Sequence, residues 1–92
     1  MIVEKVVIIK NKQGLHARPA ALFVQIANKF ASEITLVKGR QKINGKSIMG
    51  IMMLAAGAGS KITVIANGDD ADKAMVELEK LLLADDIDQF VI

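Results

Sequence analysis

The chain has 92 residues, of which 52% are apolar and 24% are charged, and its formal net charge is +2. Residues 1–92 are expected to form a single domain, and no apolar run approaches the ~20 residues that cross a bilayer. Ten acidic residues nearly balance twelve basic ones and only three phenylalanines are aromatic, which argues against a nucleic-acid partner. The absence of cysteine excludes disulfides and thiolate metal sites. Because no secretion signal is recognisable, we expect a cytoplasmic protein.

The chain begins with a predicted strand and a predicted helix. Residues Ile2 to Ile9 are rich in Val and Ile, which is typical of a strand, and a polar loop follows from Lys10 to Gly14. From Ala17 to about Lys29, apolar residues recur at three- and four-residue steps, which indicates a helix with one buried face. The strand is apolar on its second face as well, where it carries Ile2, Val6 and Ile8.

The next segment predicts a β-hairpin. Two short runs, Ile34 to Val37 and Arg40 to Ile43, contain strand-forming residues and are separated by Lys38-Gly39. The pair Asn44-Gly45 then marks a turn out of the second strand. The two strands are therefore expected to be antiparallel neighbours in one sheet.

A short helix is predicted from Ile48 to about Leu54. Ser47 is a favourable N-cap residue for it, and Gly57 and Gly59 are expected to end it. Apolar residues surround almost the whole helix, so one core-facing stripe does not hide them all: Ile48, Met49, Ile51, Met52, Met53 and Leu54. This pattern is typical either of an adaptable docking surface or of an ordinary core in which Met fills gaps.

The last two predicted elements are a strand and a helix. Lys61 to Ala66 has the alternation of a strand, and Asn67-Gly68 turns out of it. Asp69 or Asp70 is expected to cap the following helix, which carries the clearest apolar stripe of the chain. That stripe consists of Ala71, Ala74, Met75, Leu78, Leu81 and Leu82. The whole order, βαββαβα, predicts an α+β fold in which a small sheet has its helices on one face.

Residues 14–19 carry the candidate site. They read Gly-Leu-His-Ala-Arg-Pro and contain the only histidine and the only proline of the chain. Gly14 permits a tight backbone path, and the fixed φ of Pro19 suits the first turn of a helix. The N-terminus of that helix directs backbone amides and a positive dipole end toward His16, and Arg18 adds a permanent charge. These neighbours would neutralise an anion, including a phosphoryl group carried by the imidazole itself.

Two motifs resemble one known family. The runs Gly14-Leu-His-Ala-Arg-Pro-Ala20 and Lys46-Ser-Ile-Met-Gly50, at this separation and with this order of elements, closely resemble HPr. HPr is the histidine-containing phosphocarrier of the phosphoenolpyruvate-dependent sugar phosphotransferase system. The resemblance extends from residue 1 to about residue 84. It implies an open-faced β-sandwich, with a four-stranded antiparallel sheet and three helices on one face, and a relay protein rather than an enzyme, without metal or cofactor.

The same resemblance implies roles for individual residues. His16 would accept a phosphoryl group from enzyme I on its Nδ1 atom and pass it to the IIA domains of sugar permeases. Arg18 would neutralise the transferring group, and the backbone amides near Ala17 and Arg18 would hydrogen-bond its oxygens. Such chemistry requires mainly positioning and charge stabilisation from the protein. The family's partner contacts lie around the histidine and along the short helix, where the best matches are Ile48, Met49 and Met52.

Ser47 has a second implied role. In HPr proteins of Gram-positive type, a serine in this setting is phosphorylated by an ATP-dependent HPr kinase/phosphorylase. The modified protein binds a catabolite control repressor and accepts phosphate from enzyme I poorly. A phosphate adds about −1.5 to −2 charges, which a helix N-terminus tolerates, so this modification need not unfold the helix.

Three other interpretations stay open at this point. A regulatory protein could act through the serine alone, as do the Crh relatives, which lack the active histidine; His16 argues against it. A carrier of the nitrogen-related branch of the system is a second alternative, although the run from Lys46 to Gly50 favours the sugar branch. The third alternative is a small nucleic-acid-binding module, which the nearly balanced charge of this chain disfavours.

The segment from Asp85 to Ile92 departs from the family pattern. It ends in apolar residues, whereas carriers of this kind usually end in polar ones. We expect it to fold back onto the sheet, to pair between chains or to fray, and these three alternatives stay open.

Overall fold

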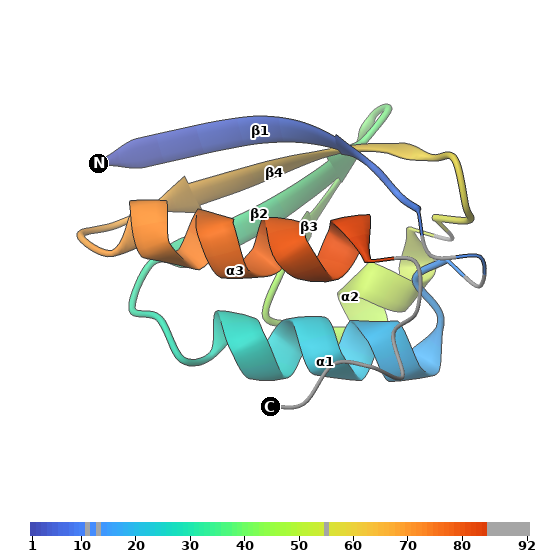
Figure 1. The fold of residues 1–92 in the computed structure, drawn as a ribbon, viewed down its shortest axis with the longest axis horizontal. Helices are drawn as coiled ribbons and strands as arrows, with labels where there is room; N and C mark the ends of the chain where they lie inside the picture. Colours follow the sequence, from blue (N-terminus) through green and yellow to red (C-terminus); the bar gives the residue numbers. More distant parts are fainter. Residues whose placement is uncertain (11, 13, 55, 85–92) are drawn as a thin grey trace.

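The computed structural model describes residues 1–10, 12, 14–54 and 56–84. Within these residues seven elements follow one another, and their bounds agree with the predicted ones to within two residues. They are β1 (Ile2–Ile8), α1 (Ala17–Ala27), β2 (Glu33–Lys38), β3 (Gln41–Asn44), α2 (Ile48–Met53), β4 (Lys61–Asn67) and α3 (Ala71–Leu83). Figure 1 shows two layers, one formed by the sheet and the other by the three helices. The predicted α+β class and element order are confirmed.

The four strands form one antiparallel sheet in the order β1-β4-β2-β3. The strands β1 and β4 pair along their whole length, from Ile2 opposite Asn67 to Ile8 opposite Lys61. The strand β4 also pairs with β2, and the β2–β3 hairpin completes the sheet. This sheet with helices on one side is the open-faced β-sandwich that the resemblance implies.

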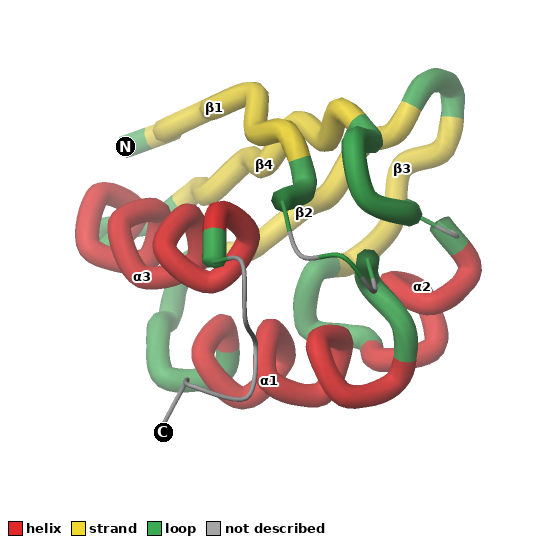
Figure 2. Tube along the Cα trace, turned by 45° about the vertical axis from the view of Figure 1, so that its right-hand side comes forward, coloured by secondary structure: helices red, strands yellow, loops and turns green. Residues whose placement is uncertain are grey.

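The hydrophobic core lies between the sheet and the three helices, which Figure 2 shows on one side of the strands. Alternate strand residues enter it, among them Val7 of β1, Leu36 of β2 and Val64 of β4, which are at most 2% exposed. The helix α3 contributes the predicted apolar stripe: Ala71, Ala74, Met75, Leu78, Leu81 and Leu82. Burial of this apolar surface is the main contribution to the stability of the fold.

None of the three helices in the described residues covers the other face of the sheet. On this face of the edge strand β1, the side chains of Ile2, Val6 and Ile8 are 67%, 59% and 42% exposed. The predicted apolar second face of the first strand therefore exists and is exposed, because the three helices cover only the opposite face.

Two predictions about the ends of elements are wrong. The hairpin turn lies at Gly39-Arg40, one residue later than predicted, because Lys38 pairs with Gln41. The helix α2 ends at Met53, before the two glycines that were expected to end it. The ammonium of Lys38 donates a hydrogen bond of 3.1 Å to the carbonyl oxygen of Leu54, and so satisfies an acceptor at the end of this helix.

Asp70 lies at the start of α3, but its carboxylate does not cap that helix as predicted. The carboxylate accepts hydrogen bonds from the loop between α1 and β2 instead. Its donors are the hydroxyl of Ser32, the backbone amide of Ala31 at 2.9 Å and the backbone amide of Ser32 at 3.0 Å. These hydrogen bonds, above all that of the Ser32 hydroxyl, hold the pKa of Asp70 below its ordinary value of 3.8. Asp70 therefore joins two connecting segments that are far apart in the sequence.

Candidate functional site

His16 occupies the N-cap position of α1, with extended backbone angles of φ −90° and ψ −161°. Its carbonyl oxygen accepts a hydrogen bond of 2.9 Å from the amide of Ala20, which begins the helical pattern. The imidazole is exposed and makes no capping hydrogen bond. An exposed imidazole therefore stands at the positive end of an 11-residue helix.

The loop before His16 is anchored on the segment that follows α2. Leu15 is 5% exposed, and its amide donates a hydrogen bond of 2.8 Å to the carbonyl oxygen of Ala56. Gly14 has a φ of +69°, and a Cβ atom there would lie 2.5 Å from the same carbonyl oxygen. Because a side chain fits neither this φ nor this approach, the prediction that Gly14 permits a tight path is confirmed.

The first turn of α1 supplies positive charge beside His16. Ala17 and Arg18 are exposed there, whereas Pro19 is buried and needs no partner for an amide hydrogen. All four residues of this turn are described, and none of them is acidic. The charge of Arg18 and the helix dipole therefore add, with no carboxylate in the turn to cancel them. This surface favours an anion next to the imidazole.

Ser47 begins the second helix as predicted. Its backbone is extended, and its Oγ atom accepts a hydrogen bond of 3.0 Å from the amide of Gly50. The residue is half-buried, and its hydroxyl serves as a helix cap. The predicted N-cap of α2 is confirmed.

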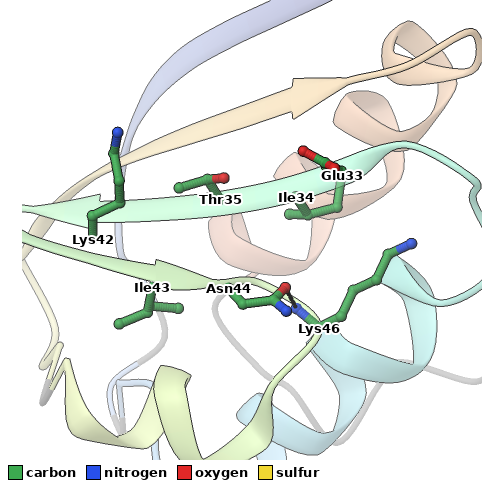
Figure 3. A pocket seen from close by; sticks show the side chains of 7 residues that line it. All are labelled: Glu33, Ile34, Thr35, Lys42, Ile43, Asn44 and Lys46. Atoms are coloured by element: carbon green, nitrogen blue, oxygen red, sulfur yellow. Dashed lines mark hydrogen bonds between the residues drawn. The ribbon is translucent and has the colours of Figure 1, made fainter.

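Beside Ser47 lies a contact that sequence reasoning misses. The Nζ atom of Lys46 donates a hydrogen bond of 2.7 Å to the carbonyl oxygen of Phe30, shortly after the end of α1. The amide of Lys46 donates a second one, of 2.9 Å, to the side-chain oxygen of Asn44 (Figure 3). No local pattern signals the first bond, because its partners are 16 residues apart. It links the turn before α2 to the far end of α1.

Figure 3 also shows a hollow of about 420 Å³ at the β2–β3 edge of the sheet. Its lining residues are Glu33, Ile34, Thr35, Lys42, Ile43, Asn44 and Lys46. The lining carries charges of both signs and includes none of the predicted site residues. We therefore assign this hollow no part in phosphoryl chemistry.

The surface of α2 is mostly apolar. Ile51 and Leu54 enter the core, whereas the other apolar residues are exposed: Ile48 by 42%, Met49 by 69%, Met52 by 41% and Met53 by 68%. The alternative in which these methionines fill gaps in the core is therefore wrong. The helix α2 packs against α1, and Figures 1 and 2 both place it beside the start of α1, where His16 lies. The exposed apolar residues and the histidine thus share one end of the molecule.

No group of His, Cys, Asp or Glu side chains among the described residues is arranged to hold a metal ion. None of the helices in the described part of the chain has the length and apolar character needed to cross a membrane.

Fold and site define a small α+β protein that presents one histidine at a helix N-terminus, and comparison with known proteins gives its family. The family model described as PTS HPr component phosphorylation site matches residues 3–84. The chain belongs to this HPr family of the phosphotransferase system, whose members are phosphocarriers and not catalysts.

Similar proteins include both Crh and HPr proteins. Over 77 residues the chain is 58% identical to the HPr-like protein Crh of Halalkalibacterium halodurans, which covers 84% of this chain and 92% of that protein. Over 80 residues it is 46% identical to the phosphocarrier protein HPr of Treponema pallidum, with 87% and 91% covered. The crystal structure of an HPr from Bacillus anthracis superimposes with a TM-score of 0.85 at 49% identity, covering 88% and 96% of the two chains.

Proposed function

We propose that this protein acts as a cytoplasmic phosphocarrier that takes a phosphoryl group from phospho-enzyme I onto His16. It then passes the group to the IIA domains of sugar permeases. The observation that carries this proposal is the exposed imidazole at the start of α1, beside Arg18 and not engaged in capping. The protein is a relay and has no turnover of its own.

In the proposed transfer, the lone pair of Nδ1 of His16 attacks the phosphorus atom of the phosphohistidine of enzyme I. One nitrogen–phosphorus bond forms while another breaks, so the free-energy change is small and the group can be passed on. The amides of Ala17 and Arg18 hydrogen-bond the phosphoryl oxygens, and the Arg18 guanidinium balances their charge. The protein's contribution is thus positioning and electrostatic stabilisation.

The exposed apolar surface of α2 is the proposed partner contact. Ile48, Met49 and Met52 would meet enzyme I and the IIA domains around the histidine. Methionine side chains are unbranched and polarizable, so one surface can adapt to several partners. This suits a carrier that visits different proteins in turn.

Ser47 is the proposed regulatory site. Phosphorylation there by an HPr kinase/phosphorylase would place about −1.5 to −2 charges at the N-terminus of α2, beside the proposed partner contact. The added charge would repel acidic surfaces of enzyme I and favour a catabolite control repressor. The structural support is that Ser47 is half-buried and that its hydroxyl caps α2.

The test is the intact mass after incubation with phosphoenolpyruvate and enzyme I. We expect one acid-labile phosphate on the natural chain and none on His16→Ala, and we expect an added IIA domain to remove it. The chain has two arginines, which provide a matched pair of variants. Arg18→Gln should slow the transfer, whereas Arg40→Gln in the hairpin turn should not. Phosphate acceptance by His16→Ala would overturn the proposal.

The regulatory part has its own test with ATP and HPr kinase/phosphorylase. We expect an acid-stable phosphate that Ser47→Ala abolishes and that Ser60→Ala, the matched control, retains. Ser47→Asp should also react more slowly with enzyme I. Equal phosphorylation of Ser47→Ala and the natural chain would show that the site lies elsewhere.

A second candidate function follows from the 58% identity to a Crh protein. In it, the protein regulates through Ser47 alone and carries no phosphoryl group for sugar transport. The same two experiments separate the candidates. An acid-stable phosphate at Ser47 without any acid-labile phosphate at His16 would favour the regulator.

A further inference from the structure

The exposed methionines of α2 lie together on one helix face. Met52 and Met53 follow Met49 by three and four residues, and side chains at these spacings are neighbours on a helix surface. Met49 is 69% exposed, Met52 41% and Met53 68%. Ile51 and Leu54, which enter the core, point to the opposite side. We call Met49, Met52 and Met53 the methionine face of α2.

The other two methionines of the chain have different surroundings. Met1 is 64% exposed, and Figures 1 and 2 both show the N-terminus at the end of the molecule away from α2. Met75 is 2% exposed and belongs to the hydrophobic core. The chain has five methionines and no cysteine, so thioethers are its only sulfur groups. Oxidation at sulfur can therefore be compared at the methionine face, at a remote surface and in the core.

Methionine thioethers react with peroxides. The sulfur lone pair attacks one oxygen of hydrogen peroxide, the O–O bond breaks, and the displaced hydroxide takes the proton of the transferred hydroxyl and leaves as water. The sulfur loses two electrons and the peroxide gains them. The product is a polar, chiral sulfoxide, which methionine sulfoxide reductases convert back to the thioether. Because the oxidant must reach the sulfur atom, we expect exposed methionines to react before Met75.

Oxidation of the methionine face should spare the fold. Its three residues are not members of the hydrophobic core, and α2 is held by the Ser47 cap and by the buried Ile51 and Leu54. In the free protein the sulfoxide oxygens stay hydrated. When a partner covers them, water is removed from polar groups for which an apolar contact offers no hydrogen bond. The energetic cost therefore falls on docking rather than on folding.

We propose that the methionine face of α2 is an oxidation site at which peroxides reversibly weaken the docking of enzyme I and IIA domains. This inference rests on the proposed phosphocarrier function, because it concerns the proposed partner contact. The predicted alternatives for residues 85–92 fall outside the described part of the chain, and this site does not include that segment.

The experiment treats the folded natural chain with hydrogen peroxide, which catalase then removes before any partner is added. Peptide mass spectrometry should find sulfoxide at Met49, Met52, Met53 and Met1, with Met75 unmodified. In transfer from phospho-enzyme I, the oxidised chain should show a several-fold higher KM and an unchanged maximal rate. The methionine face contacts the partner and not the reacting atoms, so only KM should change. Treatment with both epimer-specific sulfoxide reductases should restore the original KM.

Two variants locate the effect. In the triple variant Met49→Leu, Met52→Leu and Met53→Leu, a similar side-chain volume is kept without sulfur. Its KM after peroxide should equal its own KM before peroxide, whatever that starting value is. The matched control is Met1→Leu, which removes an exposed methionine far from α2. It should respond to peroxide as the natural chain does.

Every other outcome overturns the proposal. An unchanged KM in the fully oxidised natural chain would show that the methionine face does not affect docking. An equal rise of KM in the triple variant, or a lower maximal rate at constant KM, would place the damage elsewhere, for example on His16. A changed circular dichroism spectrum would mean unfolding instead of weaker docking. If the untreated chain accepts no phosphoryl group at all, the proposed function fails and this inference falls with it.

Discussion

Two helices of this protein begin in opposite ways. At the start of α1, the His16 imidazole makes no capping hydrogen bond and is exposed. At the start of α2, the Ser47 hydroxyl accepts a hydrogen bond of 3.0 Å from the amide of Gly50 and is half-buried. The first side chain does not cap its helix and is accessible at the surface, where the proposed transfer would take place. The second side chain stabilises its helix directly, so a modification there acts on structure and charge together.

At the start of α1, residues other than the histidine hold the loop in place. The start of α1 is held by backbone and by neighbours, namely the buried Leu15 and the close approach of Gly14 to Ala56. Because these residues fix the loop, the histidine itself need not. The turn before α2 is held by its neighbours as well, since the amide of Gly45 donates a hydrogen bond of 2.7 Å to the carbonyl oxygen of Ile34, but here the side chain of Ser47 supplies the cap.

The largest expected effect comes from His16→Ala. Phosphoryl acceptance from enzyme I should be lost completely, whereas the free energy of unfolding should change by no more than about 0.5 kcal/mol, because an exposed side chain without a cap bond is removed. Thermal melting and intact mass measured on the same preparation check both parts. A large loss of stability would contradict the separation of reactivity from folding.

Gly14→Ala should damage both properties. An alanine at this positive φ costs about 1–2 kcal/mol, and its Cβ would also lie 2.5 Å from the carbonyl oxygen of Ala56. The loop must then move, and transfer to His16 should slow. Gly39→Ala is the matched control, since it has a φ of +59° but no atom within 4 Å of the added Cβ. Equal destabilisation by the two variants, measured in urea, would remove the role of the Ala56 contact.

Asp70 extends the comparison to the third helix start, where the side chain serves a neighbouring loop. Its folded-state pKa is lowered, so the stability it contributes is present above the ordinary value of 3.8 and is lost as pH falls through the lowered value. Asp70→Asn should lower the melting temperature at neutral pH and flatten its fall in acid. Melting curves from neutral pH to strong acid check this. Parallel curves for the variant and the natural chain would contradict it.

Ser47→Ala should cause only a modest loss of stability. Loss of one N-cap hydrogen bond costs about 1 kcal/mol, and transfer to His16 should be preserved. Chemical denaturation and the enzyme I assay measure the two quantities. If the variant were as stable as the natural chain, the hydroxyl would not act as the cap described for α2.

Much of the fold could be predicted from the sequence, because strand and helix patterns are local. The apolar stripe of α3 and the N-cap at Ser47 are examples, and so is the glycine before His16. The contacts that could not be predicted join residues far apart in the chain. Asp70 bonds the Ala31–Ser32 loop rather than its own helix, and Lys46 bonds the carbonyl of Phe30. The packing of α1 against α2 and α3 brings such partners together.

The candidate site likewise has features that the sequence predicts and features that depend on tertiary packing. The motif around His16 and Arg18 predicted a helix start with positive charge, since these residues are adjacent in sequence. The anchoring of that loop on Ala56 depends on tertiary packing, because Leu15 and Ala56 are far apart in the sequence and no local pattern connects them. The exposure of Met49 and Met53 likewise depends on how α2 lies on the core.

The most direct test of the central claim is to locate the phosphate after incubation with phosphoenolpyruvate and enzyme I. Phosphorus NMR, combined with the histidine nitrogen signals, distinguishes a phosphate on imidazole from one on a hydroxyl. The account predicts one acid-labile phosphate on Nδ1 of His16, with the Ser47 hydroxyl unmodified. A phosphate on Ser47, or none on His16 from a competent enzyme I, would contradict it.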